Sequence, residues 1–211
     1  SLHDALPICM KFIESIRLEN GILPRLDLHQ RRVNLTLLAH YGKAAAIDLT
    51  RELMHRSLPA AGLFKIRVTY DRKITGIDIA PYVRRAVARV ELVDAGALDY
   101  RYKYADRAAL DALREKVSIA VQPVLTRDGL ITDALYANVC LFDGKAWVTP
   151  EKPLLEGTAR AAALAAGEVI AAPVRSEDFR KGRYSKVKLI NCMSLFAEAQ
   201  EVPCKAAPRM A

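Results

Sequence analysis

The chain has 211 residues, 52% of them hydrophobic and 27% charged, a composition typical of a globular protein with a sizeable core. Its longest apolar runs, such as AALAAGEVIAAPV, are interrupted by Glu, Gly and Pro before the roughly 18 residues that a membrane-spanning helix needs. The formal net charge of +8 is spread along the chain and is not gathered in one long basic run. We therefore expect no nucleic-acid or membrane partner, but an enzyme that attracts small anionic molecules.

The cysteine pattern predicts reduced thiols. Cys9, Cys140, Cys192 and Cys204 form no CxxC pair and have no metal-ligand spacing with the histidines. We therefore expect no disulfide and no metal site. No basic segment followed by a long apolar core is recognisable as a secretory signal, so the expected location is the cytoplasm.

Periodicity and turn residues predict the elements of the first half of the chain. In chain order they are two short strands about an Asn20-Gly21 turn in residues 12–25, a helix over 28–41 capped by Asp27, a helix around 46–58, two strands about a polar turn in 65–79, and a strand over 88–93.

The second half begins with the tyrosine-rich DYRYKYADR, after which Asp106 starts a helix. Two hairpins follow, 120–133 and 137–150, with Asp-Gly turns, and a loop leads to a helix over 158–167. These elements predict an α+β protein with an N-terminal lobe over 9–95 and a C-terminal lobe over 96–195, joined near residues 94–99. We expect residues 196–211 to form a weakly ordered tail.

Three stretches carry groups suited to chemistry. Lys103 lies between tyrosines, where partial desolvation would make its amine nucleophilic; a surface lysine lying along tyrosine rings is the alternative. The Gly157-Thr158-Ala159 turn starts a helix and can hold a phosphate, or it is an ordinary helix entry. Asp133 could bind a heteroaromatic nitrogen, or it is a turn aspartate bound to its own backbone.

Taken together and in order, four motifs resemble the class IV aminotransferase family, the pyridoxal-phosphate enzymes of fold type IV. FIESIR resembles the family's Phe-Glu-Thr-Ile-Arg strand, LHQRRVN its His-x-x-Arg-Leu helix, DGLITDALYANVCLF its Asp-Gly-x-Val-Thr-Glu segment, and PLLEGTAR its phosphate turn. The family includes branched-chain and D-amino acid aminotransferases and 4-amino-4-deoxychorismate lyases. The resemblance implies a two-lobed fold with the cofactor between the lobes, and a homodimer.

Carried over to this sequence, the resemblance assigns the site residues. It makes Lys103 the catalytic lysine that forms the Schiff base with pyridoxal 5'-phosphate, and Arg32 the arginine that binds the cofactor phosphate. The amides of Gly157, Thr158 and Ala159 would bind the same phosphate, and Asp133 stands where most relatives have the Glu that bonds the pyridine nitrogen.

Some positions depart from the family pattern. Asp133 is one methylene shorter than Glu, Ala134 and Leu135 replace the usual Thr-Ser pair, and Ala159 lacks a hydroxyl. The opening pair of strands found in many relatives has no counterpart before Phe12.

The resemblance to short members leads us to expect a 4-amino-4-deoxychorismate lyase-like enzyme that releases pyruvate and 4-aminobenzoate in folate synthesis. An aminotransferase for branched-chain or D-amino acids is the alternative, and a non-catalytic relative of the same fold is a third possibility. The substrate would be a small anionic amine, with Arg67 as a candidate carboxylate contact unless it is an outward strand arginine.

The first eight residues, SLHDALPI, match one translated frame of a common sequencing adapter. We therefore expect them to be an artefact of read assembly. On that interpretation Met10 is the natural start, or an upstream piece of the gene is missing.

Overall fold

The computed structural model describes residues 10–42 and 47–204, so the SLHDALPI segment lies outside the described residues. The chain divides into two compact units. The N-terminal unit comprises the chain up to Val83 together with Tyr102–Asp106, and the C-terminal unit comprises Arg84–Arg101 and the chain from Arg107 onward.

These boundaries correct the predicted join near residues 94–99. The strand β4 (Arg89–Asp94), assigned from the sequence to the N-terminal lobe, pairs in parallel with β5 (Val121–Arg127) of the C-terminal unit. Conversely, Tyr102–Asp106 returns to the N-terminal unit, where it lies beside β1 (Phe12–Glu19). Both pairings join segments that are distant in sequence, and the local pattern of hydrophobic residues does not predict which distant segment a strand pairs with.

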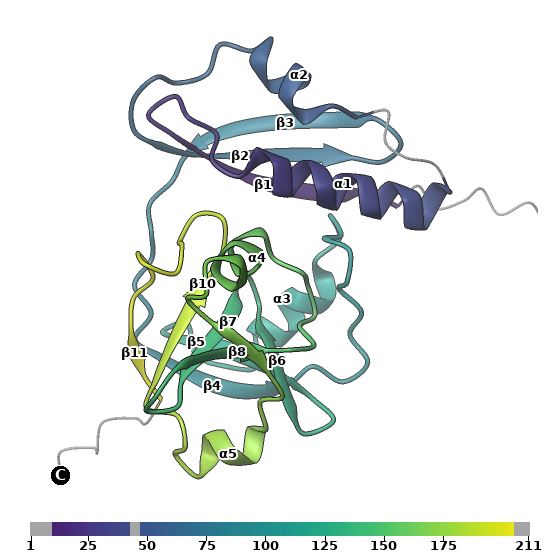
Figure 1. Ribbon diagram of the computed structural model, residues 1–211. Helices are drawn as coiled ribbons and strands as arrows, with labels where there is room; N and C mark the ends of the chain where they lie inside the picture. The colour runs from purple at the N-terminus through teal and green to yellow at the C-terminus, as the bar shows by residue number, and fades with distance from the viewer. Residues whose placement is uncertain (1–9, 43–46, 205–211) are drawn as a thin grey trace, which may run out of the picture. The chain divides into compact units, whose positions relative to one another are not determined.

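The N-terminal unit is a three-stranded antiparallel sheet, in the order β1-β2-β3, with two helices (Figure 1). Its other elements are α1 (Leu26–Tyr41), α2 (Leu49–Met54), β2 (Leu63–Tyr70) and β3 (Ile74–Pro81). The Asn20-Gly21 turn forms as predicted, with positive φ at both residues, but it closes a single Glu19–Ile22 bridge and not a second strand. Asp27 lies in the first turn of α1, whose N-cap is Arg25.

Alternation along the strands separates the two faces of this sheet. One face packs against the helices and forms the core, which contains Phe12, Ile16, Leu18, Val33, Leu37, Leu49, Leu53, Ile66, Val68 and Tyr70. Glu14 belongs to the same face of β1, between Phe12 and Ile16, and is fully buried. A carboxylate therefore interrupts an apolar row.

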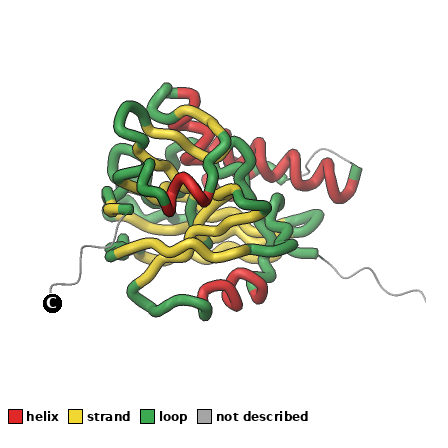
Figure 2. Tube along the Cα trace, turned by 90° about the horizontal axis from the view of Figure 1, so that it is seen from below, coloured by secondary structure: helices red, strands yellow, loops and turns green. Residues whose placement is uncertain are grey.

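The C-terminal unit contains a five-stranded sheet, in the order β11-β10-β7-β8-β9, and a three-stranded sheet, in the order β4-β5-β6. Figure 2 shows the strands in yellow. Its further elements are α3 (Ala108–Arg114), β6 (Leu130–Ala134), β7 (Asn138–Phe142), β8 (Trp147–Pro150), α4 (Thr158–Ala165), β9 (Ile170–Ala172), α5 (Ser176–Arg180), β10 (Lys186–Ile190) and β11 (Val202–Pro203). The predicted Asp128-Gly129 and Asp143-Gly144 turns connect antiparallel strand pairs, so both hairpins are confirmed.

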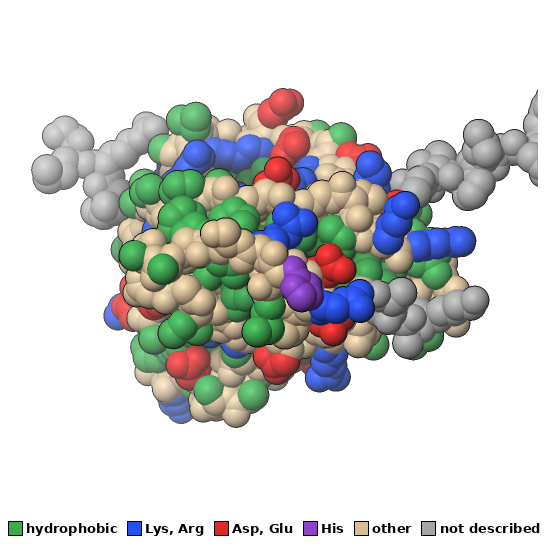
Figure 3. Space-filling view, turned by 90° about the horizontal axis from the view of Figure 1, so that it is seen from above, with side chains coloured by type: hydrophobic (Ala, Val, Ile, Leu, Met, Phe, Trp, Pro, Cys, Tyr) green, Lys and Arg blue, Asp and Glu red, His purple; other side chains and the backbone are tan. Residues whose placement is uncertain are grey.

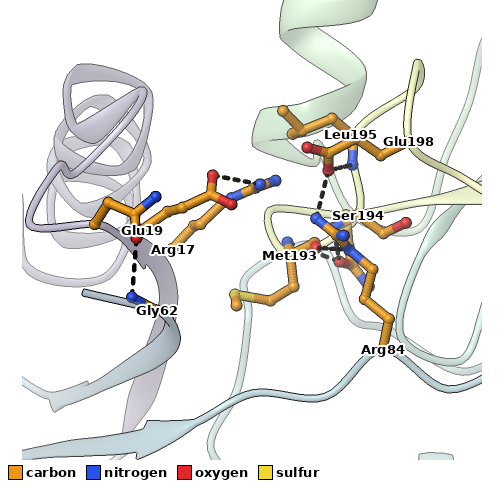
Figure 4. A network of polar contacts seen from close by, with 10 residues as sticks. Arg17, Glu19, Gly62, Arg84, Met193, Ser194, Leu195 and Glu198 are labelled. Carbon is orange, nitrogen blue, oxygen red and sulfur yellow. Dashed lines mark hydrogen bonds and ion pairs between the residues drawn. The ribbon is translucent and has the colours of Figure 1, made fainter.

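The prediction of a weakly ordered tail is wrong for residues 196–204, the part of the tail that the structure describes. β11 pairs with β10, and Val202 is buried. In the C-terminal unit, Arg84 donates from Nε to the Met193 carbonyl at 3.1 Å and from Nη2 to Glu198 at 2.8 Å (Figure 4). These contacts hold the final segment against the start of the unit.

Charged side chains of both signs are interspersed with hydrophobic ones on the face seen in Figure 3. Within the described part of the chain, no helix is long and apolar enough to cross a membrane, and no group of three or more His, Cys, Asp or Glu side chains could hold a metal. Cys140 is a buried free thiol whose pKa is raised to about 12 by burial, so it contributes packing and not reactivity.

Candidate cofactor and active site

Backbone pairing holds Lys103 in place within the N-terminal unit. The Ile13 amide donates to the Lys103 carbonyl at 2.8 Å, and the Ala105 amide donates to the Lys11 carbonyl at 2.8 Å. Lys103 thus lies opposite Ile13, on the face of the sheet away from the helices, by strand alternation. Its neighbours Tyr102 and Tyr104 pack against the core on the other face. The tyrosines therefore anchor the segment that carries the lysine.

Arg32 is bound to a buried carboxylate. It extends from α1 to Glu14 of β1 and donates from Nε to Oε1 at 2.7 Å and from Nη2 to Oε2 at 2.5 Å. His29, one turn earlier on the same helix, places Nδ1 at 2.6 Å from the same Oε2. The Arg32 guanidinium and His29 overcome the effect of burial and lower the pKa of Glu14 to about 2, so Glu14 is ionised at neutral pH.

His29 links this cluster electrostatically to Lys103. Burial lowers the pKa of His29, and the positive charges of Arg32 and Lys103 lower it further, whereas Glu14 raises it. The imidazole is therefore neutral at pH 7. Its proton belongs on Nδ1, where it can be donated to the Glu14 carboxylate.

Arg67 shares a sheet face with Lys103. Arg67 on β2 is directly opposite Ser15 on β1, and Lys103 is opposite Ile13 two residues earlier. Because alternate residues of a strand point to the same face, the two cationic side chains leave the sheet on the same side, separated by β1. This placement was not visible in the sequence.

In the C-terminal unit, Asp133 on β6 is a buried carboxylate held by neutral amides. Asn138 on β7 donates from Nδ2 to Oδ1 at 2.7 Å, and the Leu155 amide donates to Oδ2 at 2.9 Å. Burial raises the pKa of Asp133 to about 7 despite these hydrogen bonds. Asp133 is thus not a solvated turn residue, and a cationic ligand group would stabilise its ionised form.

The predicted phosphate turn lies next to this carboxylate, at the start of α4. Gly157 is the N-cap, and its position permits no side chain, because an added Cβ would lie 1.9 Å from the Asn138 Oδ1 atom. Arg160 fixes the first turn of the helix by donating to the Pro150 carbonyl and to Glu156, each at 2.8 Å. Thr158 and Ala159 are buried in this turn. The amides of the first helical turn carry the positive end of the helix dipole.

The residues present fit pyridoxal phosphate in their donor and acceptor chemistry. A buried carboxylate held by neutral amides suits a protonated ring nitrogen, and a glycine-started helix and a fixed guanidinium suit a phosphate. Arg32, Lys103 and Arg67 lie in the N-terminal unit, whereas Asp133, Gly157, Thr158 and Ala159 lie in the C-terminal unit.

Sequence reasoning missed the partners of these groups, Glu14, His29, Asn138 and Arg160. Glu14 had a signal in the pattern itself, since it occupies an apolar position of an alternating strand, and His29 and Arg160 lie within the quoted motifs. Asn138 lies on β7, and its Nδ2 donates both to the Asp133 carboxylate and, at 2.9 Å, to the Leu155 carbonyl. These contacts depend on tertiary structure.

Comparisons with known proteins agree with the motifs. Residues 11–197 match the model of the family described as amino-transferase class IV. An uncharacterized protein of Haemophilus influenzae is 29% identical over 183 residues, which cover 86% of this chain and 96% of that protein.

Solved structures share the fold. A protein of Haemophilus somnus 129PT, proposed to be a 4-amino-4-deoxychorismate lyase, is 28% identical with a TM-score of 0.81, covering 87% of this chain and 96% of that one. A hypothetical aminotransferase from Mycobacterium tuberculosis, solved with pyridoxal phosphate bound, is 18% identical with a TM-score of 0.70, covering 97% and 86%. The predicted α+β fold is confirmed. The chain belongs to the class IV aminotransferase family and is a pyridoxal-phosphate-dependent enzyme.

Proposed function

We propose that the protein is a 4-amino-4-deoxychorismate lyase-like enzyme that releases pyruvate and 4-aminobenzoate. The observation that carries this choice is the similarity to the Haemophilus somnus protein proposed to have that activity, which extends over 96% of that protein. The substrate would be a small amine with carboxylates, which suits a chain of net charge +8.

On this proposal, the charged and polar groups described above would hold the cofactor. Arg32 and the amides of Gly157, Thr158 and Ala159 would bind its phosphate, and Asp133 would accept a hydrogen bond from its protonated ring nitrogen. When bound, the cofactor withdraws electrons from the carbon that carries the substrate amine. Because burial raises the pKa of Asp133 to about 7, a cationic ring nitrogen would favour the ionised carboxylate at neutral pH.

Lys103 is the proposed catalytic base and acid. Its Nζ removes the proton from the carbon that carries the amine. It later delivers a proton to the departing enolpyruvyl group, which leaves as pyruvate. Formation of the aromatic ring of 4-aminobenzoate drives the elimination. Arg67, on the same sheet face as Lys103, is proposed to bind a substrate carboxylate. We further propose a homodimer, to be tested by sedimentation analysis.

Two measurements test this proposal. The purified protein should be yellow with pyridoxal phosphate and lose its colour on borohydride reduction, and Lys103→Ala should abolish the covalent attachment. A wild-type protein that takes up no pyridoxal phosphate would contradict the site assignment. Supplied with aminodeoxychorismate, the loaded enzyme should form 4-aminobenzoate. Amino transfer from glutamate or a branched-chain amino acid, without 4-aminobenzoate, would establish an aminotransferase instead.

A further inference from the structure

The cluster of Glu14, His29 and Arg32 places three ionisable groups among apolar side chains. Glu14 is 0% exposed and His29 is 1% exposed, and Phe12 and Ile16 on either side of Glu14 on the same sheet face are also fully buried. Burying charged groups costs free energy, and apolar residues of similar volume often serve the fold equally well. Apolar residues would fill this position without that cost, so the cluster calls for a functional explanation.

The geometry fixes the plane of one guanidinium. Glu14 accepts from Nε and Nη2 of Arg32, which is the two-point contact that orients an arginine side chain. A guanidinium has five N–H bonds, so three of them point away from Glu14. The Arg32 side chain is 13% exposed, whereas the Glu14 side chain is fully buried, so Glu14 orients the guanidinium from the interior of the unit.

His29 restrains the carboxylate that orients Arg32. Its Nδ1 bonds Oε2, the oxygen that also accepts from Arg32 Nη2, and it leaves Oε1 to Arg32 Nε. The charged groups that influence His29 are Glu14 from β1, Arg32 from its own helix and Lys103 from the segment beside β1. A neutral imidazole can donate a hydrogen bond to the carboxylate, while Arg32 supplies the positive charge that balances it.

We propose that Glu14 and His29 are positioning residues that hold the Arg32 guanidinium in the orientation that binds the cofactor phosphate. The inference rests on the proposed phosphate role of Arg32. Glu14 sets the plane of the guanidinium, and His29 sets the rotation of the Glu14 carboxylate. Neither residue contacts the phosphate itself.

The test compares two ligands that differ only in the phosphate, pyridoxine 5'-phosphate and pyridoxine. Neither carries the aldehyde, so binding to the cofactor-free full-length protein reports recognition without attachment to Lys103. The variants are Glu14→Gln, His29→Leu and His29→Asn, with Arg32→Met as the reference for complete loss of the contact. Glu19→Gln is the matched control, because Glu19 is the exposed carboxylate at the end of the same strand and pairs with Arg17.

We expect the affinity ratio of the phosphorylated to the unphosphorylated ligand to fall about tenfold or more in Glu14→Gln and His29→Leu, toward the value for Arg32→Met. His29→Asn places an amide N–H near the position of Nδ1 and should keep the ratio close to that of the wild type, as should Glu19→Gln. A folding defect lowers the affinity for both ligands and leaves their ratio unchanged, so the ratio separates positioning from stability.

If Arg32→Met lowers the ratio while Glu14→Gln and His29→Leu retain the wild-type ratio, the positioning inference is overturned and the proposed function stands. If the wild-type protein takes up neither pyridoxal phosphate nor pyridoxine phosphate, the proposed function itself fails. The triple variant Glu14→Leu, His29→Leu, Arg32→Met replaces all three groups with apolar ones. It should remain folded and show the low ratio of Arg32→Met, even where Glu14→Gln is too unstable to measure.

Discussion

Gly157→Ala is the sharpest test of the structure around Asp133, because the added methyl group would clash with the Asn138 side chain that binds this carboxylate. The added Cβ would lie 1.9 Å from the Asn138 Oδ1 atom, so the Asn138 amide must move. That movement breaks its bonds to the Asp133 carboxylate and to the Leu155 carbonyl. A hydrogen bond to a charged group contributes about 1.5–3 kcal/mol and a neutral one about 0.5–1.5 kcal/mol, so we expect a destabilisation of roughly 2–4 kcal/mol.

Urea unfolding followed by Trp147 fluorescence measures this effect, since Trp147 is the only tryptophan in the chain and lies in the C-terminal unit. Asn138→Ala removes the obstacle together with its hydrogen bonds, so the double variant should be about as stable as Asn138→Ala alone. Gly76→Ala, followed by circular dichroism, is the control, because its Cβ would meet only the Thr69 Cβ at an ordinary 3.9 Å. Additive losses for Gly157→Ala and Asn138→Ala would refute the clash as the cause.

Three further predictions concern charge. Burial raises the pKa of Asp133 to about 7 in the folded protein, from an ordinary value of 3.8. Protonated Asp133 therefore stabilises the cofactor-free folded state by roughly 4 kcal/mol below pH 3.8, and this contribution is lost as the pH rises to about 7. In Asp133→Asn, the urea midpoint should no longer fall over this pH range. Glu14 has a pKa of about 2 in the folded protein, against an ordinary 4.5. Ionised Glu14 therefore contributes about 3 kcal/mol to the free energy of unfolding above pH 4.5, and this contribution is lost as the pH falls through 2. In Glu14→Gln, acid titrations followed by circular dichroism should no longer show this loss of stability. Arg67→Met should raise KM for a carboxylate substrate about tenfold or more with little change in bound pyridoxal phosphate, and an unchanged KM in steady-state kinetics would exclude the carboxylate contact.

Local signals predicted local structure well. The Asp128-Gly129 and Asp143-Gly144 turns form hairpins because Asp128, Gly129 and Gly144 adopt the positive φ that such turns need, and Asp143 accepts hydrogen bonds from the Lys145 and Ala146 amides. Asn20-Gly21 carries the same signal and makes the same kind of turn, but the chain leaves the sheet after Ile22. A turn motif thus predicts the reversal, while strand formation after it depends on a partner supplied by the rest of the fold.

Long-range pairing accounts for the incorrect boundaries. The sequence of β4 identifies a strand but not its parallel partner β5, which lies beyond α3. Likewise, nothing local in the tail shows that the Gln200 side chain will bond both the amide and the carbonyl of Val87, at 2.9 and 3.0 Å. Residues 196–204 are ordered by contacts with residues more than a hundred positions earlier, so the composition of the tail alone could not show that this part is well ordered.

Glu14 in the N-terminal unit and Asp133 in the C-terminal unit are both buried carboxylates, but only Asp133 lacks a cationic partner at hydrogen-bond distance among the described residues. Glu14 has a fixed guanidinium at hydrogen-bond distance, and its pKa falls to about 2. Asp133 has only neutral amides at that distance among the described residues, and its pKa rises to about 7. A cationic ring nitrogen would therefore stabilise ionised Asp133 strongly, whereas Glu14 already has its counter-charge and leaves Arg32 oriented for an anion. This contrast supports assigning the ring nitrogen to Asp133 and the phosphate to Arg32, and it predicts that Asp133→Asn weakens binding of the protonated ring while leaving the preference for a phosphate unchanged.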